Sequence, residues 1–420
     1  MTATAWSTAR IKAAVGGILA VLLLATVLVP TAAEAAPVAG GDRFTAVAPV
    51  RVLDTRDGTG GHLGRLWPPG PIDLVLGGES VPATATAVVL NVTAVAPSDL
   101  GNIRVFPTPA SGNAVPLVSN LNVRQWTDQP NLVTVKLGAG GAVRFAIERA
   151  TADLVVDLAG YYSPTGTTAY TPVTPVRMMD LRDGTGSVPV GRLEFKSWVD
   201  LQVRGRNGVP ADATAVVLNV TAVAPFGPTN IRVYPRPADS ASQVPPVISN
   251  LNPAGNGEDQ PNLVTVQIGD GGKVRFYTEA YSTWLVADLA GYYSPTGGQG
   301  YTALDPARIA DTRSGLGLAS TLRAGVTSTL TVAGVGGVPA EATAVVLNVT
   351  AASPRGTTNI RVFPTVVGGA VPLISNLNVN RAVDEPNLVI VPVGAGGAVS
   401  FYTQSYDTEL VVDVQGYFTP

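Results

Sequence analysis

Three residue types capable of directional polar chemistry recur in a fixed order along this chain: aspartate, arginine and asparagine. An Asp-x-Arg motif opens each of three copies, and the octapeptide AVVLNVTA follows it, beginning at Ala87, Ala215 and Ala344. Each octapeptide places an asparagine among aliphatic residues. Asp, Arg and Asn present donors and acceptors that suit sugar hydroxyls, or that bind one another within a scaffold.

The candidate residues occupy equivalent places in the three copies. Each copy also has a tyrosine near its end that could stack on a sugar ring. The candidates are Asp54, Arg56, Asn91, Arg104, Asn120, Asn122, Asn131, Asp157, Tyr161, Asp180, Arg182, Asn219, Arg232, Asn250, Asn252, Asn262, Asp288, Tyr292, Asp311, Arg313, Asn348, Arg361, Asn376, Asn378, Asn387, Asp413 and Tyr417. One interpretation is a glycan-binding face. The other is a hydrogen-bonded scaffold, which we favour because whole apolar strands recur together with the polar residues.

The residues needed for common catalytic sites are scarce. His62 is the only histidine and the chain has no cysteine, so neither a Cys-His pair nor a His-rich metal site can form. A serine triad would depend on His62 alone. A calcium loop at DTRDGTGG is not maintained, because the third copy reads DTRSGLG. A glycosidase needs only two carboxylates, but nearby arginines would keep Asp54 and Asp157 ionised. We therefore predict no enzyme, no metal and no cofactor.

The positions of the recurring motifs divide the chain into three repeats. Asn91, Asn219 and Asn348 are spaced by 128 and 129 residues, which is the size of a whole domain. Ser-Pro-Thr-Gly segments separate the copies and are typical of exposed turns. We predict a signal peptide at 1–35, a linker at 36–43, and repeats at 44–164, 165–296 and 297–420. The short linkers favour a stiff rod of three domains.

A period of two dominates each repeat. In the first octapeptide, Val88, Leu90 and Val92 are expected on one face, and Val89 and Asn91 on the other. Seven to nine short strands per copy, separated by Gly, Pro and Asn turns, predict an all-β protein. We expect three tandem antiparallel β-sandwich domains, jelly-roll-like, after the signal peptide. A β-trefoil or small barrel in each repeat is the alternative.

Composition and the N-terminus restrict the partners. Charged residues make up 14% of the chain and the net charge is −3, which argues against a nucleic-acid partner. Arg10 and Lys12 precede an apolar run, and Ala33-Glu34-Ala35 fits a signal-peptidase site. We therefore expect export after cleavage at residue 35, and no membrane span after that cleavage.

The assembled motifs resemble a known type of repeat. VLDTR, AVVLNVTA, SNLN and a closing GYY or GYF are similar to the repeats of secreted, largely uncharacterised actinobacterial proteins, and similar units are appended to exported peptidases and cell-wall hydrolases. The resemblance covers residues 44–420. It implies an extracellular β-rich module that supports attachment or display. The second copy departs from the pattern with Asp-Leu-Arg, and no catalytic domain accompanies the repeats.

Two functions follow as hypotheses. The first is a non-catalytic array that attaches to the cell surface or cell wall by binding glycan, with cell-wall polysaccharide as the expected partner. Linked weak sites would gain avidity from repetition. The second is a structural or adhesive extracellular spacer that binds a surface protein through its loops or sheet edges. The sequence predicts no oligomeric state.

Overall fold

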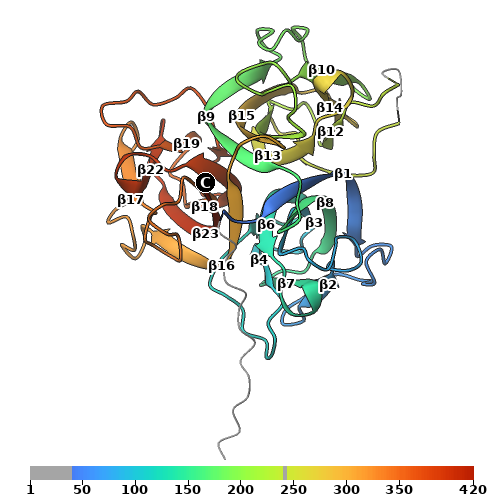
Figure 1. The fold of residues 1–420 in the computed structure, drawn as a ribbon, viewed down its shortest axis with the longest axis vertical. Coiled ribbons are helices and arrows are strands. Elements are labelled where there is room, and N and C mark those ends of the chain that lie inside the picture. The colour runs from blue at the N-terminus through green and yellow to red at the C-terminus, as the bar shows by residue number, and fades with distance from the viewer. Residues whose placement is uncertain (1–39, 240–243) are drawn as a thin grey trace, which may run out of the picture. The chain divides into compact units, whose positions relative to one another are not determined.

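Six small antiparallel sheets, two from each repeat, form a six-bladed β-propeller (Figure 1). The computed structural model describes residues 40–239 and 244–420. Helix occurs among these residues as three single 3-10 turns, at Ala139–Gly141, Asp270–Gly272 and Ala395–Gly397. The prediction of an all-β protein is confirmed, and so are the seven to nine strands per repeat.

The strands of the three repeats correspond closely. The first repeat contains β1 (Arg43–Asp54), β2 (Ile72–Val75), β3 (Ala87–Val95), β4 (Gly101–Pro107), β5 (Leu121–Val123), β6 (Gln129–Lys136), β7 (Ala142–Glu148) and β8 (Asp153–Ser163). The second contains β9 (Ala169–Asp180), β10 (Trp198–Gln202), β11 (Ala215–Val223), β12 (Ile231–Pro235), β13 (Gln260–Gln267), β14 (Lys273–Thr278) and β15 (Trp284–Ser294). The third contains β16 (Gly300–Asp311), β17 (Thr327–Thr331), β18 (Ala344–Ala352), β19 (Thr358–Pro364), β20 (Leu377–Val379), β21 (Glu385–Pro392), β22 (Ala398–Thr403) and β23 (Glu409–Thr419).

Each repeat has an inner sheet and an outer sheet. The inner sheets have the orders β1-β8-β3-β6, β9-β15-β11-β13 and β16-β23-β18-β21. The outer sheets have the orders β2-β7-β4-β5, β10-β14-β12 and β17-β22-β19-β20. The first and last strands of a repeat therefore pair with each other, and this pairing sets Arg51 opposite Asp157.

The octapeptide forms the middle strands β3, β11 and β18 of the inner sheets, and it is buried on both faces. Val88, Leu90 and Val92 pack with the outer sheet of the same repeat in one hydrophobic cluster. Val89 lies on the opposite face, in a fourth cluster that all three repeats share at their common centre. The predicted alternation along this strand is confirmed.

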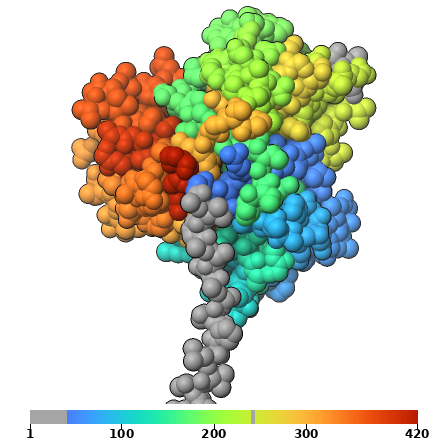
Figure 2. All heavy atoms as spheres, viewed as in Figure 1, coloured from blue at the N-terminus to red at the C-terminus, as the bar shows by residue number. Residues whose placement is uncertain are grey.

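The shared central cluster explains why the predicted architecture is wrong. The fold is neither a series of tandem β-sandwiches nor a trefoil or small barrel in each repeat, because the six sheets form one propeller. The described residues, 40–239 and 244–420, belong to one compact unit, so the stiff rod is also wrong. The physical reason is the second apolar face of each inner sheet, which the neighbouring repeats cover. Figure 2 shows the three repeats side by side, in blue to cyan, green to yellow and orange to red.

Backbone hydrogen bonds between the first residues of β1, β9 and β16 and the residues just before these strands close the ring of repeats. Phe44 and Thr168 exchange backbone hydrogen bonds of 2.7 and 3.0 Å. Tyr170 and Gln299 likewise exchange backbone hydrogen bonds, of 3.0 and 2.8 Å. The amide and carbonyl of Asp42 bond Tyr301 at 2.7 and 2.8 Å, which joins the first repeat to the third. The end of the predicted linker 36–43 thus takes part in the fold.

No helix among the described residues has the length and apolar character needed to span a bilayer. The predicted signal peptide, 1–35, lies outside the described residues, as does the start of the linker.

Candidate functional site

The asparagines of the three octapeptides lie at the junctions between repeats. Asn91 donates from Nδ2 to the carbonyl oxygen of Ser249 in the second repeat, and its Oδ1 accepts from Asn262 Nδ2 at 2.8 Å. Asn219 makes the same contacts with the third repeat, and Asn348 makes them with the first. These side chains are almost fully buried. They bind the repeats to one another.

A second set of asparagines satisfies the free edges of the inner sheets. The strands β6, β13 and β21 are edge strands, whose unpaired backbone amides would be costly to bury. The Leu132 amide donates to Asn262 Oδ1 at 3.1 Å. At the other two junctions the Leu263 amide donates to Asn387 Oδ1 and the Leu388 amide donates to Asn131 Oδ1, both at 3.1 Å. Each of the three asparagines therefore caps the edge strand of another repeat, and the three bonds close a cycle.

The late aspartates are held by arginines that the candidate set did not include. Arg51 Nε donates to Asp157 Oδ1 at 3.0 Å, and Arg51 Nη1 reaches Asp54 Oδ2 at 3.2 Å. Asp157 Oδ2 also accepts from the backbone amide of Ser249, in the next repeat. Burial raises the pKa of Asp157, and the pairing with Arg51 offsets only part of that rise. The pKa values of Asp288 and Asp413 rise for the same reason: the arginine beside each carboxylate favours ionisation, as expected, but burial outweighs that effect.

The early aspartates behave as expected. Asp54 accepts two hydrogen bonds from the Arg56 guanidinium, at 2.8 and 2.6 Å, and a third from its backbone amide. The hydrogen bonds from Arg56 hold the pKa of Asp54 below its usual value. Asp180 with Arg182 and Asp311 with Arg313 repeat this arrangement. The motif closes a turn, and its arginine side chain is half exposed.

The SNLN motif has two separate roles. Its first asparagine accepts from a backbone amide of the outer sheet at 2.7 Å, the donors being Val105, Val233 and Val362 for Asn120, Asn250 and Asn376. Its second asparagine accepts from the serine hydroxyl of the same motif, at Asn122, Asn252 and Asn378. The first asparagine therefore anchors the segment, and the second lies nearer the surface.

The candidate tyrosines are packed against hydrophobic clusters and are not open platforms for a sugar, with Tyr161 and Tyr292 partly buried and Tyr417 buried. Tyr161 and Tyr292 pack against the clusters of their own repeats, and Tyr417 belongs to the third. The following aromatic residue instead points to the centre of the molecule. Six fully buried rings form a closed cycle there, with successive centroids 4.2 to 5.1 Å apart: Phe44, Tyr162, Tyr301, Phe418, Tyr170 and Tyr293.

The glycine before the paired aromatics makes room for this cycle. A Cβ at Gly160 would lie 2.2 Å from the ring of Phe44, and one at Gly291 would lie 2.3 Å from Tyr170 Oη. The closing Gly-aromatic-aromatic motif is therefore a packing device for the centre.

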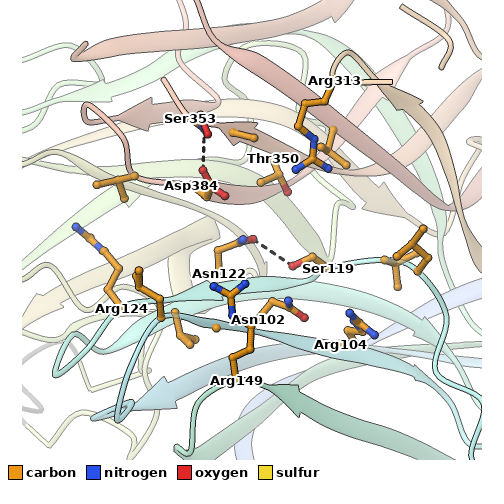
Figure 3. A pocket seen from close by; sticks show the side chains of 18 of the residues that line it. Asn102, Arg104, Ser119, Asn122, Arg124, Arg149, Arg313, Thr350, Ser353 and Asp384 are labelled. Atoms are coloured by element: carbon orange, nitrogen blue, oxygen red, sulfur yellow. Dashed lines mark hydrogen bonds between the residues drawn. The ribbon is translucent and has the colours of Figure 1, made fainter. Parts of the chain in front are cut away.

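Two clefts of matching construction open at the junctions. The first lies between the third and first repeats, has a volume of about 520 Å³, and is shown in Figure 3. The second lies between the second and third repeats and has a volume of about 300 Å³. The residues that line both at equivalent places are Asn102, Arg104, Leu117, Ser119, Asn122, Arg308, Arg313 and Thr350 in the first, and Asn359, Arg361, Leu373, Ser375, Asn378, Arg177, Arg182 and Thr221 in the second. Half of these residues belong to the candidate set or to the SNLN motif.

The arginine of the outer sheet is bonded differently at the two clefts. Arg361 donates from Nε to Asn359 Oδ1 at 3.2 Å and from Nη1 to a backbone carbonyl at 3.1 Å. Arg232 makes the corresponding bonds at the remaining junction. All three arginines also bond through Nη2 to the residue at one equivalent position, which is Glu148, Glu279 or Gln404, but Arg104 Nε has no partner.

His62 lines a third cleft, which lies within the first repeat and has a volume of about 760 Å³. Its Nε2 lies 2.8 Å from the backbone oxygen of Asp73. The Asp73 carboxylate accepts from Arg144 Nε and Nη2, each at 2.7 Å, so it does not orient the imidazole. Among the described residues there is no cluster of three or more His, Cys, Asp or Glu that could hold a metal ion.

Comparisons with known proteins give no family. No protein-family model matches the chain, and no curated protein matches it. One similar solved structure is the N-terminal CBM22-1-CBM22-2 tandem domain of Paenibacillus barcinonensis Xyn10C, with 11% identity over 59% of this chain and 99% of that chain, at a TM-score of 0.20. Another is the Sulfolobus Turreted Icosahedral Virus, with 11% identity over 84% and 85% of the two chains, at a TM-score of 0.17. Similarities at these TM-scores carry no argument about fold or function.

Sequence reasoning missed several residues at the junctions. Arg51, Arg177 and Arg308 stand three residues before the early aspartate in every copy, so their recurrence was a usable signal. Arg124 and Arg149 were missed for the opposite reason. They occur in the first repeat alone, so a comparison of recurring positions does not identify them.

Proposed function

We propose that this protein is a non-catalytic module that attaches to cell-surface or cell-wall glycan through the clefts between its repeats. The observation that carries the proposal is the repetition of one polar cleft at two junctions, with equivalent linings. Volumes of about 520 and 300 Å³ fall in the range of small-ligand sites.

The lining suits a sugar because it combines polar groups with an exposed apolar lip. Asn122 and Asn378 supply amides, and their neighbouring serines supply hydroxyl groups. Leu117 and Leu373 stand at the rims with 72% and 83% of their surface exposed. Sugar rings present hydroxyls at their edges and apolar C–H groups on their faces, so both features of the cleft have a counterpart in such a ligand.

A fixed array of weak sites favours attachment to a polymer. The clefts are held in one compact unit, so a chain with repeated units can engage more than one of them. Binding at one cleft raises the effective concentration of the polymer at the next. Attachment to a polymer therefore becomes stronger when the binding site is repeated, whereas catalysis at a single centre gains nothing from the repetition.

The carboxylates of the clefts support a non-catalytic role because they serve the fold. Asp288 in the second cleft accepts two bonds from Arg177, at 2.6 and 3.5 Å. Asp259 and Asp384 each accept a backbone amide, from Ala224 and Ser353. A glycosidase needs one carboxylic acid and one carboxylate that flank the substrate. The proposal also includes secretion, on the pattern of residues 1–35.

Retention on insoluble polymers tests the proposal. The double variant Leu117→Asp/Leu373→Asp places charges on both lips, where exposure protects the fold. The wild-type protein should be retained by purified peptidoglycan or wall polysaccharide, and the variant should be released. Val190→Asp is the matched control, since Val190 is 65% exposed and lines none of the three clefts.

Two results would contradict glycan attachment. One is equal retention of the wild-type and the double variant, and the other is a wild-type protein that no polymer retains. In the second case, self-association of the protein would favour the extracellular spacer.

A further inference from the structure

The three junctions differ at one pair of atoms, and the difference singles out the cleft between the third and first repeats. In the second repeat Arg232 Nε donates to Asn230 Oδ1 at 3.1 Å, and in the third repeat Arg361 Nε donates to Asn359 Oδ1 at 3.2 Å. In the first repeat the corresponding atoms are Arg104 Nε and Asn102 Oδ1. Both are buried, and neither has a hydrogen-bond partner.

Further unsatisfied groups line the same cleft. Thr350 is 5% exposed, and its hydroxyl has no partner. Arg124 Nε is also buried without an acceptor. Of eight such buried side-chain atoms among the described residues, four line this one cleft. A buried donor or acceptor without a partner costs about 1–3 kcal/mol, so their concentration in one place indicates a site completed by a ligand.

The same cleft carries two arginines that the other repeats lack. Ala254 and Asn380 stand at the position of Arg124, and the position of Arg149 is likewise not basic in the other copies. Arg149 makes no hydrogen bond or ion pair within the described part of the chain, whereas Arg124 lies 3.6 and 3.7 Å from Glu258 and from a second glutamate. The positive charge of Arg149 is therefore available to a ligand.

These groups face one another across the opening. In Figure 3, Arg149 extends from the first repeat toward Asn122 and Asn102, and Arg313 enters from the third repeat on the opposite side. Arg313 is bound to Asp311, so its charge is partly neutralised. Arg104 lies on the same side as Arg149.

We propose that this cleft binds an oxyanion flanked by hydroxyl groups, as in an acidic sugar unit that carries a carboxylate or a phosphate. The inference rests on the proposed glycan attachment and specifies its ligand. The oxyanion accepts from the exposed guanidinium of Arg149, because charged N–H donors match oxyanions best, and Arg104 and Arg124 in the same lining add positive charge around it. The hydroxyls donate to Asn102 Oδ1 and bond the Thr350 hydroxyl.

Calorimetric titration with soluble oligomers tests this assignment. The probes are an oligogalacturonate for the carboxylate, a glycerol-phosphate oligomer for the phosphate, and a neutral chito-oligosaccharide. The wild-type protein should bind one of the acidic probes at least tenfold more tightly than the neutral one, and added salt should weaken that binding. The two acidic probes distinguish carboxylate from phosphate.

Arg149→Ala is the informative variant, because the side chain is exposed and holds no partner in the fold. It should weaken the acidic probe about tenfold, the effect of losing one charge-assisted hydrogen bond. Arg323→Ala is the control, since Arg323 is exposed and lines none of the three clefts. This control should bind like the wild-type protein.

The possible failures of the inference and of the attachment function are separable. Equal binding of acidic and neutral probes, with no effect of Arg149→Ala, would overturn the anion site and leave glycan attachment standing. Retention on wall polymers without binding of either acidic probe would do the same. A protein that binds no oligomer and is retained by no polymer would overturn both.

Discussion

Removing Asn131, one of the three asparagines that cap the edge strands at the junctions, should cost as much stability as removing a large core side chain. Asn131 is fully buried. Its Nδ2 donates to the Asn120 carbonyl at 2.6 Å and to Asn348 Oδ1 at 2.9 Å, and its Oδ1 accepts from the Leu388 amide at 3.1 Å. In Asn131→Ala three buried groups lose a partner, and two of them belong to the third repeat.

The size of the effect follows from these three groups. Each buried group left unsatisfied costs about 1–3 kcal/mol, and relaxation around the site makes the total less than additive. We expect a loss of about 3–5 kcal/mol in the free energy of unfolding. The unfolding entropy of a unit of roughly 380 residues is about 0.8 kcal/mol/K, so the melting temperature should fall by about 4–6 °C.

Calorimetric melting and denaturant titration measure this loss. Asn256→Ala is the control, since Asn256 is exposed and its variant should stay within about 0.5 kcal/mol of the wild-type protein. A double-mutant cycle with Asn348→Ala should give a coupling of about 1 kcal/mol. If Asn131→Ala behaves like the control, or if the double variant is strictly additive, the asparagines do not hold the repeats together.

Two further changes test the junction and the centre. Burial raises the pKa of Glu385 to about 7, only partly offset by Arg124. The unfolded chain loses this proton near pH 4.5, so stability falls as pH rises from about 4.5 to 7, and Glu385→Gln should be more stable at pH 8 by about 2–3 kcal/mol in denaturant titrations. An equal pH dependence in both proteins would exclude this. Gly291→Ala forces a Cβ against Tyr170 and should lower the free energy of unfolding by about 2–3 kcal/mol, measured by thermal melting. The control Gly70→Ala, beside the exposed Trp67, should lower it by less than about 1 kcal/mol. Similar losses in the two variants would argue against a tightly packed centre.

The strands could be predicted from the sequence, but their assembly could not. Period-two alternation located the octapeptide strands and the two faces of Val88 and Val89 correctly. The same pattern does not state what covers each face. The second apolar face of a repeat can be covered by a neighbouring repeat of the same chain or by another molecule. Both arrangements require the same apolar residues, so the sequence pattern does not distinguish them. In the structure all eight positions of AVVLNVTA are buried, so both faces of this strand are covered.

The candidate site was predicted in part for a similar reason. Recurrence identified Asn91 and Asp157 as important, yet it could not show that their partners lie in the next repeat. Recurrence also directed attention away from Arg149, which breaks the symmetry. Asn91 and Asp157 recur and hold the repeats together, whereas Arg149 differs between the copies and carries the charge on which the proposed anion site depends.

Because the ring of repeats is closed, the contacts between repeats do not depend on which repeat comes first in the polypeptide. Gly40 lies against the backbone of Pro420, and the exposed Pro164 and Thr165 lie between the first two repeats. A chain opened there, with Gly40 joined to Pro420 by a few residues, would preserve every junction. Circular permutation thus leaves all three repeats with the neighbours they have now.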